Sequence, residues 1–122
     1  MKKESKIWFE KAKRDLHTAR NNLNSGDYYA ASFFAQQSVE KGLKALQLKL
    51  QKTIIKTHDL LFLSKKLKVP KTIVEKCDKL NPIYIETRYP DANSGFKEYS
   101  AEESEKDINL AGEVLSWIEK KI

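Results

Sequence analysis

Apolar residues recur at intervals of three and four positions along three long stretches of the chain. The first stretch ends at Gly26, the second follows Asp27, and the third runs from Ser100 towards the end of the sequence. Because an α-helix has about 3.6 residues per turn, this spacing gathers the apolar side chains on one helical face. The three stripes are Phe9, Ala12, Leu16, Ala19 and Leu23; Ala35, Val39, Leu43, Leu46 and Leu50; and Ile108, Ala111, Leu115, Ile118 and Ile122.

Turn and cap residues divide the remainder of the chain. Thr57 can cap a third helix with leucines along one face, and Pro70 suits the first turn of a short fourth helix. Residues 81–100 hold two prolines, a glycine and an Asn-Ser pair, so this segment is predicted to be a loop. Ser100 and Glu103 have the spacing of a capping box, which predicts the start of the last helix.

These elements predict an all-α fold, an antiparallel up-down helical bundle of three long and two short helices. No stretch alternates between apolar and polar residues as a strand would, and only 4 glycines and 3 prolines interrupt the helical patterns. A chain of 122 residues is long enough to bury one core, so residues 1–122 are expected to form a single helical domain.

Several features indicate a cytoplasmic protein. No apolar run approaches the roughly 18 residues that a membrane span requires, so no membrane association is expected. The basic N-terminus is not followed by the apolar segment of a signal peptide. The sequence has 1 cysteine, so no internal disulfide can form.

The second helix has an unusual distribution of polar and apolar residues. Its stretch "FFAQQSVEKGLKAL" places Gln37, Lys41 and Lys44 on one face, opposite the apolar stripe. The preceding "YYAASFFA" is apolar almost all round, and such a helix needs cover on two sides. We expect a second copy of the chain to supply the second cover. The residues expected at this homodimer interface are Tyr28, Tyr29, Phe33 and Phe34.

The net charge of +6 is unevenly distributed. Residues 41–79 hold eleven lysines and three carboxylates, a net charge of +8, whereas residues 98–119 have a net charge of −6. A basic stretch attracts nucleotides or nucleic acid. The alternative is a solvated lysine surface that binds nothing.

Four blocks of sequence resemble those of one family. "FFAQQSVEKGLKAL", "THDL", "YIETRYPDA" and a closing "VLSWIEK" occur in this order over nearly the whole chain. Together they resemble the HEPN domain family of prokaryotes. The resemblance implies an all-helical bundle and a homodimer. It also implies a minimal nucleotidyltransferase as partner, in toxin–antitoxin-like or nucleotide-handling modules; other branches are ribonuclease toxins.

The ribonuclease branch uses an arginine and a histidine separated by four to six residues. In that chemistry the arginine stabilises charge on the phosphate and the histidine transfers a proton near neutral pH. None of the three arginines of this sequence has a histidine at that spacing, because His17 and His58 lie elsewhere. No catalytic residue is therefore expected, although Arg88 and His58 remain able to meet in space.

We expect an anionic nucleotide such as ATP to bind between the second helix and the loop. The predicted contacts are Gln37, Lys41, Lys44, Arg88 and Tyr89. Lysine and arginine supply charge to phosphate, glutamine can hydrogen-bond a base or sugar, and tyrosine offers a stacking plane. The expected supporting residues are Glu40, His58 and Asp91.

Each of these residues also has a purely structural interpretation. The Gln37 face can be solvated surface, His58 can pack at a helix start, and Arg88 can pair with Asp91 to lock the loop. No metal-ligand spacing and no phosphate-binding glycine loop occur, so neither a metal nor a tightly held cofactor is expected. Three functions remain open: a non-catalytic nucleotide-binding or nucleotidyltransferase-partner protein, a ribonuclease, and a structural adaptor.

Overall fold

The computed structural model describes residues 3–122, and the regular elements in this range are six helices. Three are long: α1 (Lys3–Ser25), α2 (Tyr28–Gln51) and α6 (Ala101–Glu119). Three are short: α3 (Leu60–Lys66), α4 (Lys71–Leu80) and α5 (Ile83–Arg88). The prediction of an all-helical bundle is confirmed, with one short helix more than expected.

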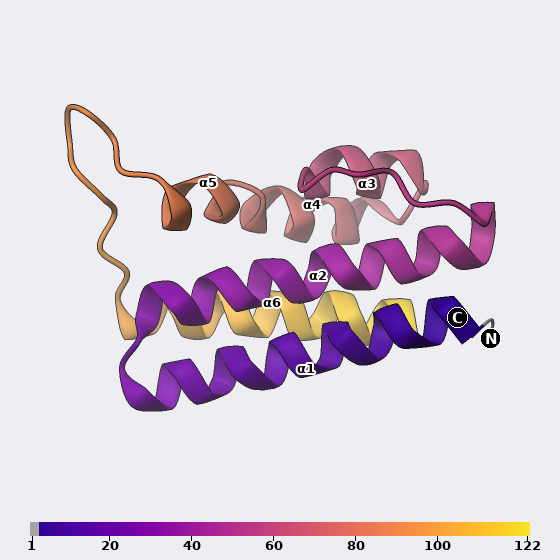
Figure 1. The fold of residues 1–122 in the computed structure, drawn as a ribbon, viewed down its shortest axis with the longest axis horizontal. Helices are drawn as coiled ribbons and strands as arrows, with labels where there is room; N and C mark the ends of the chain where they lie inside the picture. The colour runs from indigo at the N-terminus through magenta and orange to yellow at the C-terminus, as the bar shows by residue number, and fades with distance from the viewer. Residues whose placement is uncertain (1–2) are drawn as a thin grey trace.

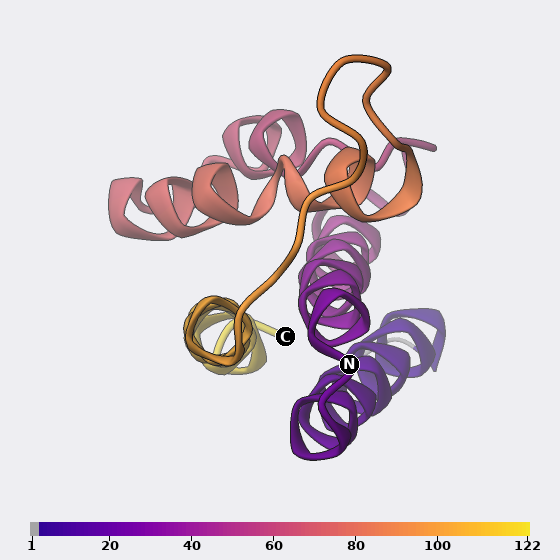
Figure 2. The ribbon, with the colours of Figure 1, turned by 90° about the vertical axis from the view of Figure 1, so that its left-hand side faces the viewer.

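The helices form two layers. The long helices α1, α2 and α6 lie side by side, and the short helices lie across the other side of α2 and α6 (Figures 1 and 2). Helix α1 runs antiparallel to α2 and α6 (Figure 1). Since α2 contacts helices of both layers, it is the central element of the fold.

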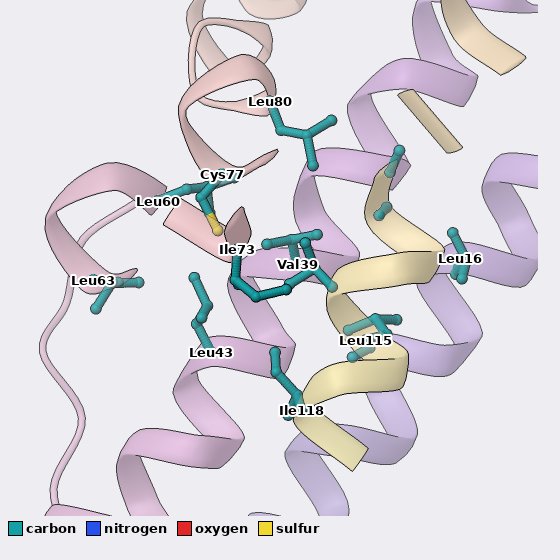
Figure 3. Close-up of a cluster of buried hydrophobic side chains, with 14 of the residues drawn as sticks. Leu16, Val39, Leu43, Leu60, Leu63, Ile73, Cys77, Leu80, Leu115 and Ile118 are labelled. Atoms are coloured by element: carbon teal, nitrogen blue, oxygen red, sulfur yellow. The ribbon is translucent and has the colours of Figure 1, made fainter. Parts of the chain in front are cut away.

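The predicted stripes make up most of the core. Leu16 of α1, Leu43 of α2 and Leu115 of α6 are buried, and α4 adds Ile73 and Cys77 from the second layer (Figure 3). Leu50, the last residue of the α2 stripe, is instead 57% exposed because the chain leaves the helix there. Burial raises the pKa of the Cys77 thiol to about 12, so this thiol stays protonated and packs as an apolar group.

Helix α5 lies inside the segment that was predicted to be a loop, so that prediction is wrong for residues 83–88. Pro82, with a φ of −64°, occupies the helix start, where its missing N–H costs no hydrogen bond. Ile83 is buried in the core and anchors the first turn. The rest of the segment, residues 89–99, is irregular as expected.

Helix α5 also changes the interpretation of the apolar front of α2. Phe33 lies against the Tyr84 ring of α5, with 6.5 Å between ring centroids, and Phe34 packs against the core. Two sides of α2 are therefore covered, as predicted, but α5 provides part of the cover that was expected from a second subunit. Tyr28 is half-buried, and Tyr29 is 60% exposed.

The helix ends follow the expected chemistry with one exception. Ser100 and Glu103 form the predicted capping box of α6. The cap of α3 is Asp59, whose carboxylate accepts from the Phe62 N–H at 3.0 Å, rather than Thr57. The Thr57 hydroxyl accepts from the Asp59 N–H instead, so it supports the capping residue. None of the helices in residues 3–122 is both long and apolar enough to cross a bilayer.

Candidate functional site

Two buried glutamines of α2 hold the connection between α2 and α3. Gln47 accepts from the Ile55 N–H at 3.1 Å, and Gln36 donates to the His58 carbonyl oxygen at 3.4 Å. Both glutamine side chains are fully buried. The connection has no helix or strand to pair its backbone N–H and C=O groups, so the glutamine amides provide hydrogen-bond partners for two of these groups. The result is that His58 lies against the middle of α2.

Glu40 is the centre of a hydrogen-bonded network on this part of α2. Its carboxylate accepts from the Lys44 ammonium at 2.9 Å and from His58 Nδ1 at 2.8 Å, and Gln37 Nε2 lies 3.5 Å away. Glu40 and Lys44 are only 4% and 6% exposed, so the two charges neutralise each other in a dry environment. The Lys44 ammonium is thus already paired with a carboxylate of its own helix.

Lys41 of α2 is engaged by α1. Its ammonium lies 2.8 Å from a carboxylate oxygen of Asp15, and it also donates to Gln37 at 3.0 Å. Asp15 is 2% exposed and is also paired with Lys11. Lys41 therefore balances a buried charge of α1.

Asp15 was not among the predicted site residues, although its position in the sequence indicates that it is buried. It lies three residues after Ala12 and four before Ala19, which places a carboxylate within the apolar stripe of α1. A charge in that position requires a buried partner. Lys41 is the partner that the structure supplies.

Four planar side chains lie next to one another beside this network; we call them the planar stack. The rings of His58 and Tyr84 lie 4.0 Å apart at an angle of 13°. The guanidinium carbon of Arg88 lies 4.9 Å from the Tyr84 centroid and 5.8 Å from the Tyr89 centroid. The structure thus brings together residues from the α2–α3 connection, from α5 and from the loop.

Glu40 fixes the tautomer of His58. A carboxylate accepts only, so the proton between the two groups belongs to His58 Nδ1. Nε2 has no hydrogen-bond partner among residues 3–122, and half of the His58 side-chain surface is exposed. The free nitrogen is available to a ligand.

Cavities lie at both ends of the planar stack. One of about 610 Å³ is lined by Arg88 and Tyr89 together with Tyr28, Tyr29 and Phe96. Another of about 480 Å³ is lined by His58 and Tyr84 with residues of α4 and its end. Residues of the stack therefore line two separate cavities.

Asp91 lies in the loop but does not pair with Arg88. Its carboxylate accepts from the N–H groups of Asn93 at 2.7 Å and Ser94 at 3.2 Å, which lowers the pKa of the Asp91 carboxyl. Gly95, at a φ of +77°, completes this turn. The expected supporting residue therefore shapes the loop tip.

The root of the loop is held by Lys97. Its ammonium lies 3.2 Å from Glu103 of α6 and 3.7 Å from Glu86 of α5. Glu86 also accepts from the Tyr99 hydroxyl at 3.2 Å. These contacts tie the loop to α5 and α6, which fixes one wall of the larger cavity.

Comparisons with known proteins give a consistent result. A family model described as the HEPN domain matches residues 5–121. The crystal structure of TT1696 from Thermus thermophilus is similar to this chain, with a TM-score of 0.90, 34% identity, and coverage of 99% of this chain and 100% of that one.

A second solved structure agrees. It is that of ST0689, an archaeal HEPN homologue, with a TM-score of 0.81, 30% identity, and coverage of 99% of this chain and 98% of that one. No curated protein matches the chain.

Proposed function

The chain belongs to the HEPN domain family, and we propose that it is a non-catalytic binding protein that holds an anionic nucleotide on the planar stack. The observation that carries the proposal is the stack itself, in which the Arg88 guanidinium lies close to the rings of both Tyr84 and Tyr89. The rings orient the guanidinium, whose N–H groups suit phosphate oxygens. The exposed Tyr89 ring offers a plane on which a base can stack.

The network on α2 supports this site. Arg88 and Tyr89 are the proposed direct contacts. The charges of Lys41 and Lys44 are already paired with Asp15 and Glu40, and the Gln37 amide lies against Glu40, so these three residues hold the two carboxylates in place. Glu40 then orients His58, whose free Nε2 can accept a hydrogen bond from the ligand.

Arg88→Ala is expected to weaken ATP binding about tenfold or more, because a charge-assisted hydrogen bond contributes roughly 1.5–3 kcal/mol. Calorimetry at low salt measures this. Lys106→Ala is the matched control: it removes one exposed positive charge from α6, and Lys106 has no salt bridge among residues 3–122. Equal losses in both variants, or no binding by the wild-type chain, would overturn the proposal.

A ribonuclease is the second candidate, and one observation favours it. His58 and Arg88 both lie against the ring of Tyr84, so the fold brings the two residue types together without the sequence spacing of the motif. The proposed binding function predicts no cleavage of single-stranded RNA above background. Cleavage that both His58→Ala and Arg88→Ala abolish would establish the ribonuclease instead.

We also propose that the larger cavity faces a protein partner, either a second copy of this chain or a minimal nucleotidyltransferase. Tyr29 and Phe96, which line this cavity, are 60% and 70% exposed, and Ile85 of the adjoining cavity is 58% exposed. Burying them against a partner is favourable.

Light scattering measures this assembly. For the homodimer we expect twice the monomer mass at micromolar concentration, and dissociation on Tyr29→Glu because the charge must be desolvated. A wild-type monomer would leave the nucleotidyltransferase as the partner to test, by co-purification.

A further inference from the structure

One end of the bundle gathers many positive charges. α2 and α6 end there, α1 begins there, and the turn between α3 and α4 lies towards the same end (Figure 1). Among residues 3–122, the only two carboxylate side chains at these helix ends are Glu4 and Glu119. The lysines at the same helix ends are all exposed: Lys3, Lys6, Lys49, Lys52, Lys65, Lys66, Lys68, Lys71, Lys120 and Lys121. We call this set the basic end.

The helix dipole explains some of these lysines, but it does not explain Lys52 and Lys68. Lysines in the last turn of a helix complement the partial negative charge there, which accounts for Lys49 and Lys65. Lys52 and Lys68 instead follow their helices with positive φ angles of +60° and +56°. These are the positions at which glycine is favoured, because a side chain crowds the backbone in the left-handed region.

The backbone at both positions forms regular helix ends. The Lys52 N–H donates to the Leu48 carbonyl at 3.0 Å. The Lys68 N–H donates to the Lys65 carbonyl at 3.1 Å, and the Val69 N–H donates to the Ser64 carbonyl at 3.3 Å. Glycine would make the same hydrogen bonds without the crowding. Folding therefore does not require a lysine at either position.

The same chain does use glycine at its other left-handed positions. Gly26 and Gly95 have φ angles of +85° and +77°, and both lie away from the basic end, between α1 and α2 and in the loop. Within residues 3–122, the only non-glycine residues with positive φ are therefore two exposed lysines near one end of the molecule. Neither forms a salt bridge with a described residue.

We propose that the basic end is a binding surface for the phosphate backbone of nucleic acid, and that Lys52 and Lys68 are present for their charge. An ammonium on a flexible stem binds phosphate as a point charge, which suits a backbone without regard to sequence. The first turns of α6 are acidic and lie at the other end of the bundle (Figure 1), so the charge distribution orients the molecule with its basic end towards a polyanion. This surface is separate from the planar stack and does not depend on the proposed function.

The test compares two double variants in a salt titration. The probe is a fluorescent DNA duplex of about 20 base pairs, and its anisotropy gives the affinity at several salt concentrations. For Lys52→Gly/Lys68→Gly we expect weaker binding and a slope of log affinity against log salt that is smaller by about two, since two phosphate contacts are lost. The melting temperature is expected to stay the same or rise, because the backbone crowding is relieved.

The control is Lys79→Ala/Lys106→Ala, which removes two exposed charges from the end of α4 and from the second turn of α6; neither lysine forms a salt bridge with a described residue. The control should keep the wild-type slope. An equal loss of slope in both double variants would show diffuse attraction and overturn the proposal. So would the absence of duplex binding at low salt, or binding to anionic lipid vesicles but not to the duplex.

Discussion

Glu40→Ala is expected to lower the free energy of unfolding by about 3–5 kcal/mol, the typical cost of removing one partner of a buried ion pair. The change leaves the Lys44 ammonium, 6% exposed, without its carboxylate partner at 2.9 Å. It also removes the acceptor of His58 Nδ1. Urea unfolding followed by circular dichroism measures the loss.

Two controls distinguish the cost of leaving one buried charge unpaired from the effect of removing any carboxylate. Glu10→Ala breaks the exposed Glu10–Lys13 pair and should cost less than about 1 kcal/mol. The double variant Glu40→Met/Lys44→Met removes both buried charges and should recover most of the stability, because apolar side chains of similar volume replace the pair. If Glu40→Ala behaves like Glu10→Ala, the pair is not buried in solution as described.

Gly42→Leu is expected to destabilise the fold by about 3 kcal/mol or more, because overpacking a filled core strains side chains and backbone. A β-carbon at Gly42 would lie 2.5 Å from Leu115 Cδ2 and 3.1 Å from Ile118 Cδ1. Both neighbours are buried residues of α6, so they have little room to move. The missing side chain is what allows α2 and α6 to approach.

Gly112→Leu is the matched control within α6. A β-carbon there meets only the Arg20 guanidinium, at 3.8 Å, which is an ordinary contact. Leucine has a higher helix propensity than glycine, so we expect the free energy of unfolding to rise by up to about 1 kcal/mol. Thermal unfolding of the two variants should shift in opposite directions; a shift of the same sign would contradict the close approach of α2 and α6.

The long helices could be predicted because their stripes repeat over several turns. Phe9 to Ala19 and Ile108 to Ile118 are buried at the expected spacing. Helix α5 could not be predicted in this way, because six residues show less than two turns of any period and Pro82, Pro90 and Gly95 dominate the surrounding pattern.

The candidate site was predictable in part. The stretches "FFAQQSVEKGLKAL" and "YIETRY" do lie in neighbouring helices. The pairing of their charged side chains, however, depends on contacts between residues that are far apart in the sequence. Lys41 meets Asp15, 26 positions away, and Glu40 meets His58, 18 positions away. The sequence of one helix does not reveal such distant partners, so Lys41 was interpreted as a charge available to phosphate, whereas the Glu40–Lys44 pair has a spacing of four residues within α2. Whether a nucleotide binds there remains a prediction.

The buried polar contacts also determine how far one helix can slide along another. Small residues such as Ala12, Ala19 and Ala35 make smooth helix faces that would tolerate several alignments. A slip of one turn, about 5.4 Å, would separate Lys41 from Asp15. The Asp15 carboxylate, which is 2% exposed, would then lose this partner.

Helix α6 is aligned in the same manner. Ser32 of α2 lies 2.9 Å from the Ser104 hydroxyl and donates to Asp107 at 2.8 Å, and burial raises the pKa of the Asp107 carboxyl. Shifting α6 by a turn would break both contacts inside the core. The polar residues thus select one alignment of the long helices among those that the apolar stripes alone would allow. The positions of the residues in the planar stack depend on that alignment.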